Sequence, residues 1–160
     1  MNHGELLPGP VPRRIVARTG ALVIAAQGDP SRDQIESYLY DSRLLALNEA
    51  DSVRGVLTLT PREPGVAEIT SLAVEDEWQE RGLGRRLLLA AIEQARDAGL
   101  QRLTIATGNS SLAQLGLYQR VGFRIVGIDP DYFVRHYPEP IFESGIQCRD
   151  QIRLALDLAA

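Results

Sequence analysis

One amphipathic segment, residues 81–98, constrains the fold more than any other part of the sequence. Its apolar side chains recur at helical spacing and share one face of a predicted helix: Leu83, Leu87, Leu88, Ala91, Ile92 and Ala95. Gly99 follows as a predicted left-handed C-terminal cap. Strand-like segments precede the helix at 66–74 and follow it at 102–107. This order predicts one parallel strand–helix–strand crossover in a sheet.

The other segments predict a mixed sheet around that crossover. Strands are expected at 14–18 or 21–27 or both, at 43–48, 53–60 and 123–128, and helices at 31–40 and 110–120. The turn at 49–52 predicts a hairpin, residues 129–149 resist assignment, and 151–158 alternate as a closing strand or a short helix. The expected fold class is therefore α/β of the α+β kind, with a mixed, mostly antiparallel sheet and flanking helices.

A single domain over residues 1–160 is expected, because 160 residues is close to the usual size of one compact domain. The first 14 residues are rich in glycine and proline and predict a loose N-terminal leader without the apolar stretch of a signal peptide. No run approaches the roughly 20 apolar residues that cross a bilayer, so we expect no membrane partner.

The charged residues exclude several function classes. All 17 basic residues are arginine, so mechanisms that need a lysine nucleophile, a Schiff base or a phosphate-loop lysine are excluded. The net charge of −4 has the wrong sign for a broad nucleic-acid-binding face. One cysteine and two histidines leave no conventional catalytic zinc cluster, so no metal is expected.

Cys148 is the single cysteine, which excludes an internal disulfide and favours a reducing, cytoplasmic location. We interpret it as a small buried apolar residue; it can be a nucleophile only if His136 lies close.

The sharpest local motif is Gln79-Glu80-Arg81-Gly82-Leu83-Gly84-Arg85-Arg86, at the start of the amphipathic helix. Glycines let backbone amides approach a ligand, and a helix N-terminus offers unpaired N–H groups, so the motif suits a diphosphate. The alternative is a helix start that merely needs glycine. A Walker loop fits poorly because Arg85 replaces its lysine, and a dinucleotide fingerprint fits poorly because Leu87 replaces its third glycine.

Two motifs carry a resemblance to a known family. Val74 followed by Gln79-x-x-Gly82-x-Gly84 resembles the central motif of the GNAT acyltransferase superfamily, and Leu117-Tyr118-Gln119-Arg120-Val121-Gly122-Phe123 resembles its second motif. The resemblance spans roughly residues 43–158. The segments 107–111, 136–141 and 148–150 look like a bacterial YvbK-like subgroup.

The resemblance implies an acetyl-coenzyme A site. The cofactor-binding residues that it implies are Leu72, Ala73, Val74, Gln79, Arg81, Gly82, Leu83, Gly84, Arg85, Arg86 and Asn109. Backbone amides of 81–86 would hold the diphosphate, and 72–74 would pair with pantetheine as with an added strand. A bulge near Leu72 or Ala73 is then expected, because two parallel neighbours must part. Ser111 stands where many relatives carry a cofactor-contacting Asn, with Asn109 two residues earlier.

Acetyl transfer to an amine needs a base and an acid. Glu68 is the candidate base, because it lies in the strand before the glycine motif and resembles the base glutamate of some members. Tyr118 stands at the position of the family's general acid. The bland alternatives are a solvent-facing glutamate and a packed tyrosine. An amide of Ala73 or Val74 is expected to polarise the acetyl carbonyl.

The acceptor is expected to be a cationic amine, because residues 118–142 are rich in aromatic and acidic side chains. Asp129 and His136 are the candidate acceptor-binding residues. The same segment can instead be an ordinary core edge or a homodimer contact. The predicted function is direct acetyl transfer from acetyl-coenzyme A to an amine of a small molecule or peptide. The alternatives are a non-catalytic acyl-coenzyme A binding module and a plain interaction domain.

Overall fold

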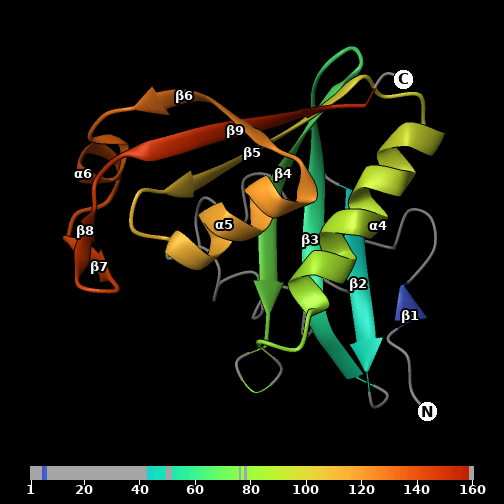
Figure 1. The fold of residues 1–160 in the computed structure, drawn as a ribbon, viewed down its shortest axis with the longest axis horizontal. Coiled ribbons are helices and arrows are strands. Elements are labelled where there is room, and N and C mark those ends of the chain that lie inside the picture. Colours follow the sequence, from blue (N-terminus) through green and yellow to red (C-terminus); the bar gives the residue numbers. More distant parts are fainter. Residues whose placement is uncertain (1–4, 7–42, 50–51, 76, 78, 159–160) are drawn as a thin grey trace.

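A computed structural model describes residues 5–6, 43–49, 52–75, 77 and 79–158 of the chain (Figure 1). Its strands are β1 (Glu5–Leu6), β2 (Arg43–Glu49), β3 (Ser52–Glu63), β4 (Val66–Val74), β5 (Arg102–Gly108), β6 (Arg124–Asp129), β7 (Ile141–Glu143), β8 (Ile146–Cys148) and β9 (Gln151–Asp157). Its helices are α4 (Leu83–Asp97), α5 (Leu112–Val121) and α6 (Tyr132–His136).

The described strands form one large sheet in the order β1-β2-β3-β4-β5-β9-β6, with β7 and β8 as a separate hairpin. Every described pairing in the large sheet is antiparallel except β4 with β5, the pair that α4 connects. The predicted fold class and the parallel crossover are therefore confirmed. The β2–β3 hairpin is also confirmed, and residues Gln151–Asp157 form a strand rather than a helix.

Helix α4 packs its apolar face on the sheet (Figure 1). Leu87, Leu88 and Ala91 of α4 are fully buried against Leu57 of β3 and Leu103 of β5 in one core cluster. Gly99 has φ of 78°, which confirms the predicted left-handed residue after the helix. The helix begins at Leu83 rather than at 81, because Gly82 is itself left-handed.

Some sequence predictions lie outside the described residues or needed correction. The strands expected at 14–18 and 21–27 and the helix at 31–40 lie outside the described part of the chain. Within the leader expected at 1–14, Glu5–Leu6 pair with β2 as a short edge strand instead of remaining loose. No helix of the described part is long and apolar enough to cross a membrane.

Candidate active site

Strands β4 and β5 diverge about halfway along their length. They pair from Val66 with Arg102 to Ile69 with Ile105, and both then continue unpaired with each other, so their arrows diverge in Figure 1. The separation coincides with a bulge in β4. On β3, Thr58 faces Ser71 and Leu59 faces Ile69, which leaves Thr70 as an extra residue. The bulge predicted near Leu72 or Ala73 therefore exists, and it lies at Thr70, two residues before Leu72.

The bulge changes which β4 side chains face the core. Ala67 and Ile69 belong to the core cluster beneath α4. Beyond Thr70, the side chains packed against that cluster are Leu72 and Val74, so the alternation has shifted by one residue.

Backbone directions beyond the bulge follow from two hydrogen bonds. The amide of Glu75 donates to the carbonyl of Arg54 at 2.8 Å, so Glu75 faces β3. Successive residues of a strand point their backbone groups to opposite edges, so Ala73 also faces β3, and Leu72 and Val74 face the β5 side. The carbonyl of Val74 accepts a hydrogen bond from Gln79 Nε2 at 3.1 Å, which ties the glycine motif to the end of β4.

The glycine motif forms the N-terminus of α4. Gly82, the N-cap residue, has φ of 79° and no side chain with which to cap the helix, and the first turn contains no acidic residue. The Arg86 amide donates to the Gly82 carbonyl at 3.1 Å, while the preceding first-turn amides, Leu83, Gly84 and Arg85, are of the kind that any helix leaves without an intrahelical partner. Its two chain neighbours aside, no heavy atom of the described residues would lie within 4 Å of a Cβ on Gly82. These amides and this open space fit an anion such as a diphosphate.

Tyr118 lies in α5, against the start of α4. Its neighbour Leu117 approaches Gly84 so closely that a Cβ there would lie 3.6 Å from Leu117 Cδ2. The Tyr118 ring is buried and lies 6.4 Å from the ring of Phe123, centroid to centroid. Burial raises the pKa of the Tyr118 phenol, so this group keeps its proton at neutral pH. The phenol is thus in the state that can donate a proton.

Glu68 lies on the opposite face of the sheet from Tyr118. It faces Thr60 across β3 and alternates with Ala67 and Ile69, which point to the core that contains Tyr118. Arg62 Nε donates to Glu68 Oε1 at 2.8 Å, and the Glu68 side chain is 30% exposed. The two candidate proton-transfer groups therefore lie on different faces of the sheet.

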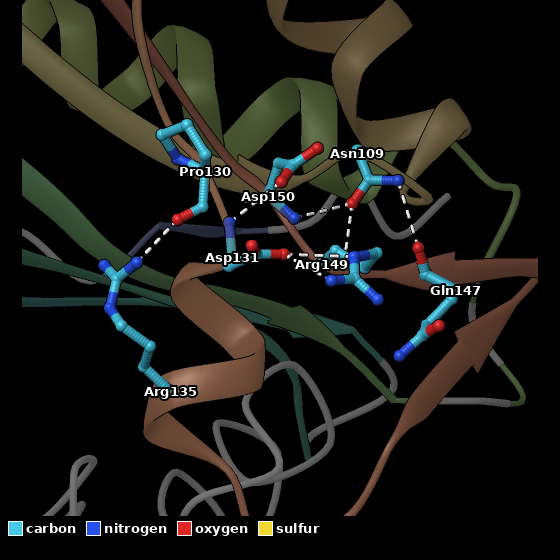
Figure 2. Close-up of polar contacts among 7 residues, drawn as sticks. All are labelled: Asn109, Pro130, Asp131, Arg135, Gln147, Arg149 and Asp150. Carbon is cyan, nitrogen blue, oxygen red and sulfur yellow. Dashed lines mark hydrogen bonds and ion pairs between the residues drawn. The ribbon is translucent and has the colours of Figure 1, made fainter.

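The side chain of Asn109 makes hydrogen bonds to the backbone between β8 and β9 (Figure 2). Its Oδ1 accepts from the amides of Arg149 at 2.8 Å and Asp150 at 2.9 Å, and its Nδ2 donates to the carbonyl of Gln147 at 3.1 Å. The Asn109 amide group is thus used by the β8–β9 connection, which does not support the cofactor contact predicted for it. Ser111, the other candidate at this position, donates to Glu143 at 2.7 Å.

The two candidate acceptor-binding residues lie at the end of β6 and in α6. The carboxylate of Asp129 pairs with Arg135 at 2.9 Å and with Arg153 at 3.6 Å. His136 is exposed and its ring lies 4.3 Å from that of Tyr132. Asp129 is therefore already neutralised by two arginines and is poorly suited to bind a cationic amine.

Cys148 is buried and free, as predicted. Burial raises the pKa of its thiol, the nearby Ser110 partly offsets this rise, and the charge of Glu143 adds to it. The thiol is therefore protonated at neutral pH, which does not favour a nucleophile. Among the described residues no group of three or more His, Cys, Asp or Glu side chains forms a metal site.

The cytoplasmic location that the single cysteine favours stays a prediction.

Comparisons with known proteins agree with this geometry. The model of the acetyltransferase (GNAT) family matches residues 21–123. The chain is 48% identical over 130 residues to the uncharacterized N-acetyltransferase YvbK of Bacillus subtilis (strain 168), covering 81% of this chain and 84% of that protein.

Two solved structures extend the likeness over nearly the whole chain. A Bacillus subtilis acetyltransferase in complex with CoA superposes with a TM-score of 0.87 and 40% identity, covering 98% of this chain and 100% of that one. A GNAT family acetyltransferase from Elizabethkingia anophelis with acetyl-CoA bound gives 0.82 and 35%, covering 98% and 96%. The motifs, the diverging strands and these likenesses agree, and the chain belongs to the GNAT family of acetyltransferases.

Proposed function

We propose that the chain is a single-domain N-acetyltransferase that moves an acetyl group from acetyl-coenzyme A directly to an amine. One observation carries the proposal. The first turn of α4, which begins after Gly82, lies next to the part of β4 that no longer pairs with β5. The bound coenzymes of the two similar structures support it.

In this proposal the backbone amides of residues 82–85 would hold the diphosphate, and Arg81, Arg85 and Arg86 would add positive charge near it. Pantetheine runs along β4, where Leu72 and Val74 offer backbone groups on the open side. The Val74 amide, rather than that of Ala73, is the donor to the acetyl carbonyl, because Ala73 faces β3. Asn109 is left out of the proposed cofactor contacts because its side-chain amide already binds three backbone groups.

Two side chains handle the protons. An alkylammonium acceptor with a pKa of about 10.4 needs about 4.6 kcal/mol to lose its proton at pH 7, and Glu68 is the proposed base that receives it. Acetyl-coenzyme A supplies the thioester, whose carbonyl carbon bonds to the amine nitrogen as the carbon–sulfur bond breaks. Tyr118 donates its proton to the departing sulfur and regains one from solvent, and solvent also takes the proton from Glu68 and the second proton that the nitrogen loses as the amide forms.

The acceptor class is proposed to be a cationic amine of a small molecule or peptide. The net charge of −4 favours a cationic partner, and Glu68 supplies a carboxylate on the face opposite α4. The ion pairs of Asp129 remove it from the proposed acceptor contacts, whereas His136 stays a candidate because it is exposed.

Calorimetry with coenzyme A and a thiol-release assay over an amine panel test the proposal. We expect binding, turnover with at least one amine, and loss of turnover with retained binding in Tyr118→Phe. Binding without turnover on any amine would favour the non-catalytic coenzyme-binding module. Absence of binding at millimolar coenzyme A would refute the proposal and leave the plain interaction domain.

A further inference from the structure

Hydroxyl side chains gather on β3 and β4, on the sheet face opposite α4. Thr70 Oγ1 lies 2.7 Å from Thr58 Oγ1 and 2.8 Å from Thr60 Oγ1. Thr58 Oγ1 also donates to Ser71 Oγ at 3.1 Å. Thr58, Thr60 and Ser71 are buried, with at most 8% of each residue exposed. We call Thr58, Thr60, Thr70 and Ser71 the hydroxyl cluster.

The cluster is centred on the bulge. Thr70 is the extra residue of β4, and its hydroxyl spans two successive same-face positions of β3, Thr58 and Thr60. The same residue marks the point beyond which β4 no longer pairs with β5, since the last pair is Ile69 with Ile105. The hydroxyl cluster therefore fastens β4 to β3 at the place where β4 leaves β5.

The bulge decides which backbone groups face the opening. Without the extra residue, the alternation of β4 beyond Ile69 would invert. Ser71 and Ala73 would then turn toward the apolar core under α4, and the amides of Leu72 and Val74 would face β3. Burying the Ser71 hydroxyl among leucines is unfavourable, whereas the observed register gives it a hydrogen-bond partner.

We propose that Thr70 is a positioning residue for the cofactor groove: its hydroxyl locks the β4 bulge, and the locked bulge presents the Leu72 and Val74 amides to pantetheine and the acetyl carbonyl. The part about the cofactor rests on the function proposed above. The part about the lock concerns the free protein alone, so the two can fail separately.

The experiment compares Thr70→Val, which keeps the shape and removes the hydroxyl, with Thr70→Ser, which keeps the hydroxyl. Thr104→Val is the matched control. Thr104 is half-buried, and its neighbours Leu103 and Ile105 point to the core, so Thr104 lies on the same face of the sheet as the hydroxyl cluster. Amide hydrogen exchange by NMR reports the lock, and calorimetry with coenzyme A reports the groove. Thermal unfolding identifies any variant that has lost its fold.

In the wild type we expect the Ala73 amide to exchange more slowly than those of Leu72 and Val74. In Thr70→Val this contrast should shrink and the Kd for coenzyme A should rise about tenfold, because coenzyme A would then bind only the roughly one molecule in ten that keeps the register of the bulge. Thr70→Ser and Thr104→Val should behave as the wild type does. If Thr70→Val does not fold, Ser71→Ala, which removes one outer hydroxyl, takes its place in both measurements.

An unchanged exchange pattern and an unchanged Kd in Thr70→Val would overturn the inference. An equal weakening by Thr104→Val would also overturn it, because any threonine of this face would then suffice. If the wild type binds no coenzyme A, the proposed function fails, and the exchange pattern alone then decides whether Thr70 locks the bulge.

Discussion

Gly82 and Gly99 offer a controlled test of the anion site, because they lie at the two ends of α4 with nearly the same φ angle. Their φ angles are 79° and 78°, and, chain neighbours aside, a Cβ on either would have no heavy atom of the described part of the chain within 4 Å. Alanine at either position therefore pays only the cost of a left-handed conformation, about 1–2 kcal/mol. The two sites are about 25 Å apart at 1.5 Å per helical residue.

Both variants should lose the same stability, which corresponds to a fall in melting temperature of about 2–4 °C per kcal/mol for a domain of this size. Only Gly82→Ala should weaken coenzyme A, by at least about tenfold, because its methyl group occupies the open space beside the first-turn amides. Thermal unfolding followed by calorimetric titration measures both quantities on the same samples. Equal stability losses with equal Kd values would refute the placement of a diphosphate at Gly82.

Other residues give separate predictions. Burial raises the pKa of Tyr118, so its phenol stays protonated at a pH where the acceptor amine has lost its proton. The rate of the wild-type enzyme should therefore keep rising as the pH is raised toward 10. A fall in rate near pH 10 that disappears in Tyr118→Phe would contradict this assignment. An added Cβ on Gly108 would overlap Cys148 Sγ, so Gly108→Ala should cost about 1–3 kcal/mol in urea unfolding and much less in a Cys148→Ala background; equal costs in both would argue against the contact. Asn109→Ala should lower stability by about 1–3 kcal/mol with an unchanged Kd for coenzyme A, whereas weaker binding at unchanged stability would return Asn109 to the cofactor site.

Elements with their own local signal were predicted well. The apolar face of α4, the left-handed Gly99 and the crossover from β4 to β5 each follow from neighbouring residues, and the structure confirms them. The start of α4 was misplaced by two residues, because a helix pattern does not reveal that Gly82 adopts a left-handed conformation.

The position of the bulge carried a signal that sequence reasoning missed. The core-facing apolar residues of β4 occupy odd positions at Ala67 and Ile69 and even positions at Leu72 and Val74, so the alternation breaks at Thr70, although Val66 and Ala73 make this break less clear in the sequence. The sequence-based expectation placed the bulge from the family's cofactor contact rather than from this break. The hydroxyl partners on β3 could not be found locally, since they depend on the register between two strands.

The side chains around 109–150 show why the acceptor end resisted prediction. Asn109 lies 40 residues before Arg149 and 41 before Asp150, and its hydrogen bonds with them exist only once β5, β8 and β9 are assembled (Figure 2). Asp129 was expected to face a cationic ligand, but the pairing of β6 with β9 brings Arg153 near it. The sequence alone does not reveal which cation pairs with a carboxylate, and therefore does not reveal whether that carboxylate is available to bind a ligand.

The two faces of the sheet give the proposed mechanism its geometry. Tyr118 belongs to the core on the α4 side, whereas Glu68 points to the other side, and the sheet between them is continuous as far as Ile69 and Ile105. A thioester that both groups serve must therefore lie beyond that pair, in the opening between β4 and β5. In the proposed mechanism the acceptor loses its proton to Glu68 on one face, while the sulfur gains a proton from Tyr118 on the other. The bulge at Thr70 sets the register of the β4 residues that line the opening, so it fixes how far the thioester lies from Glu68 and from Tyr118.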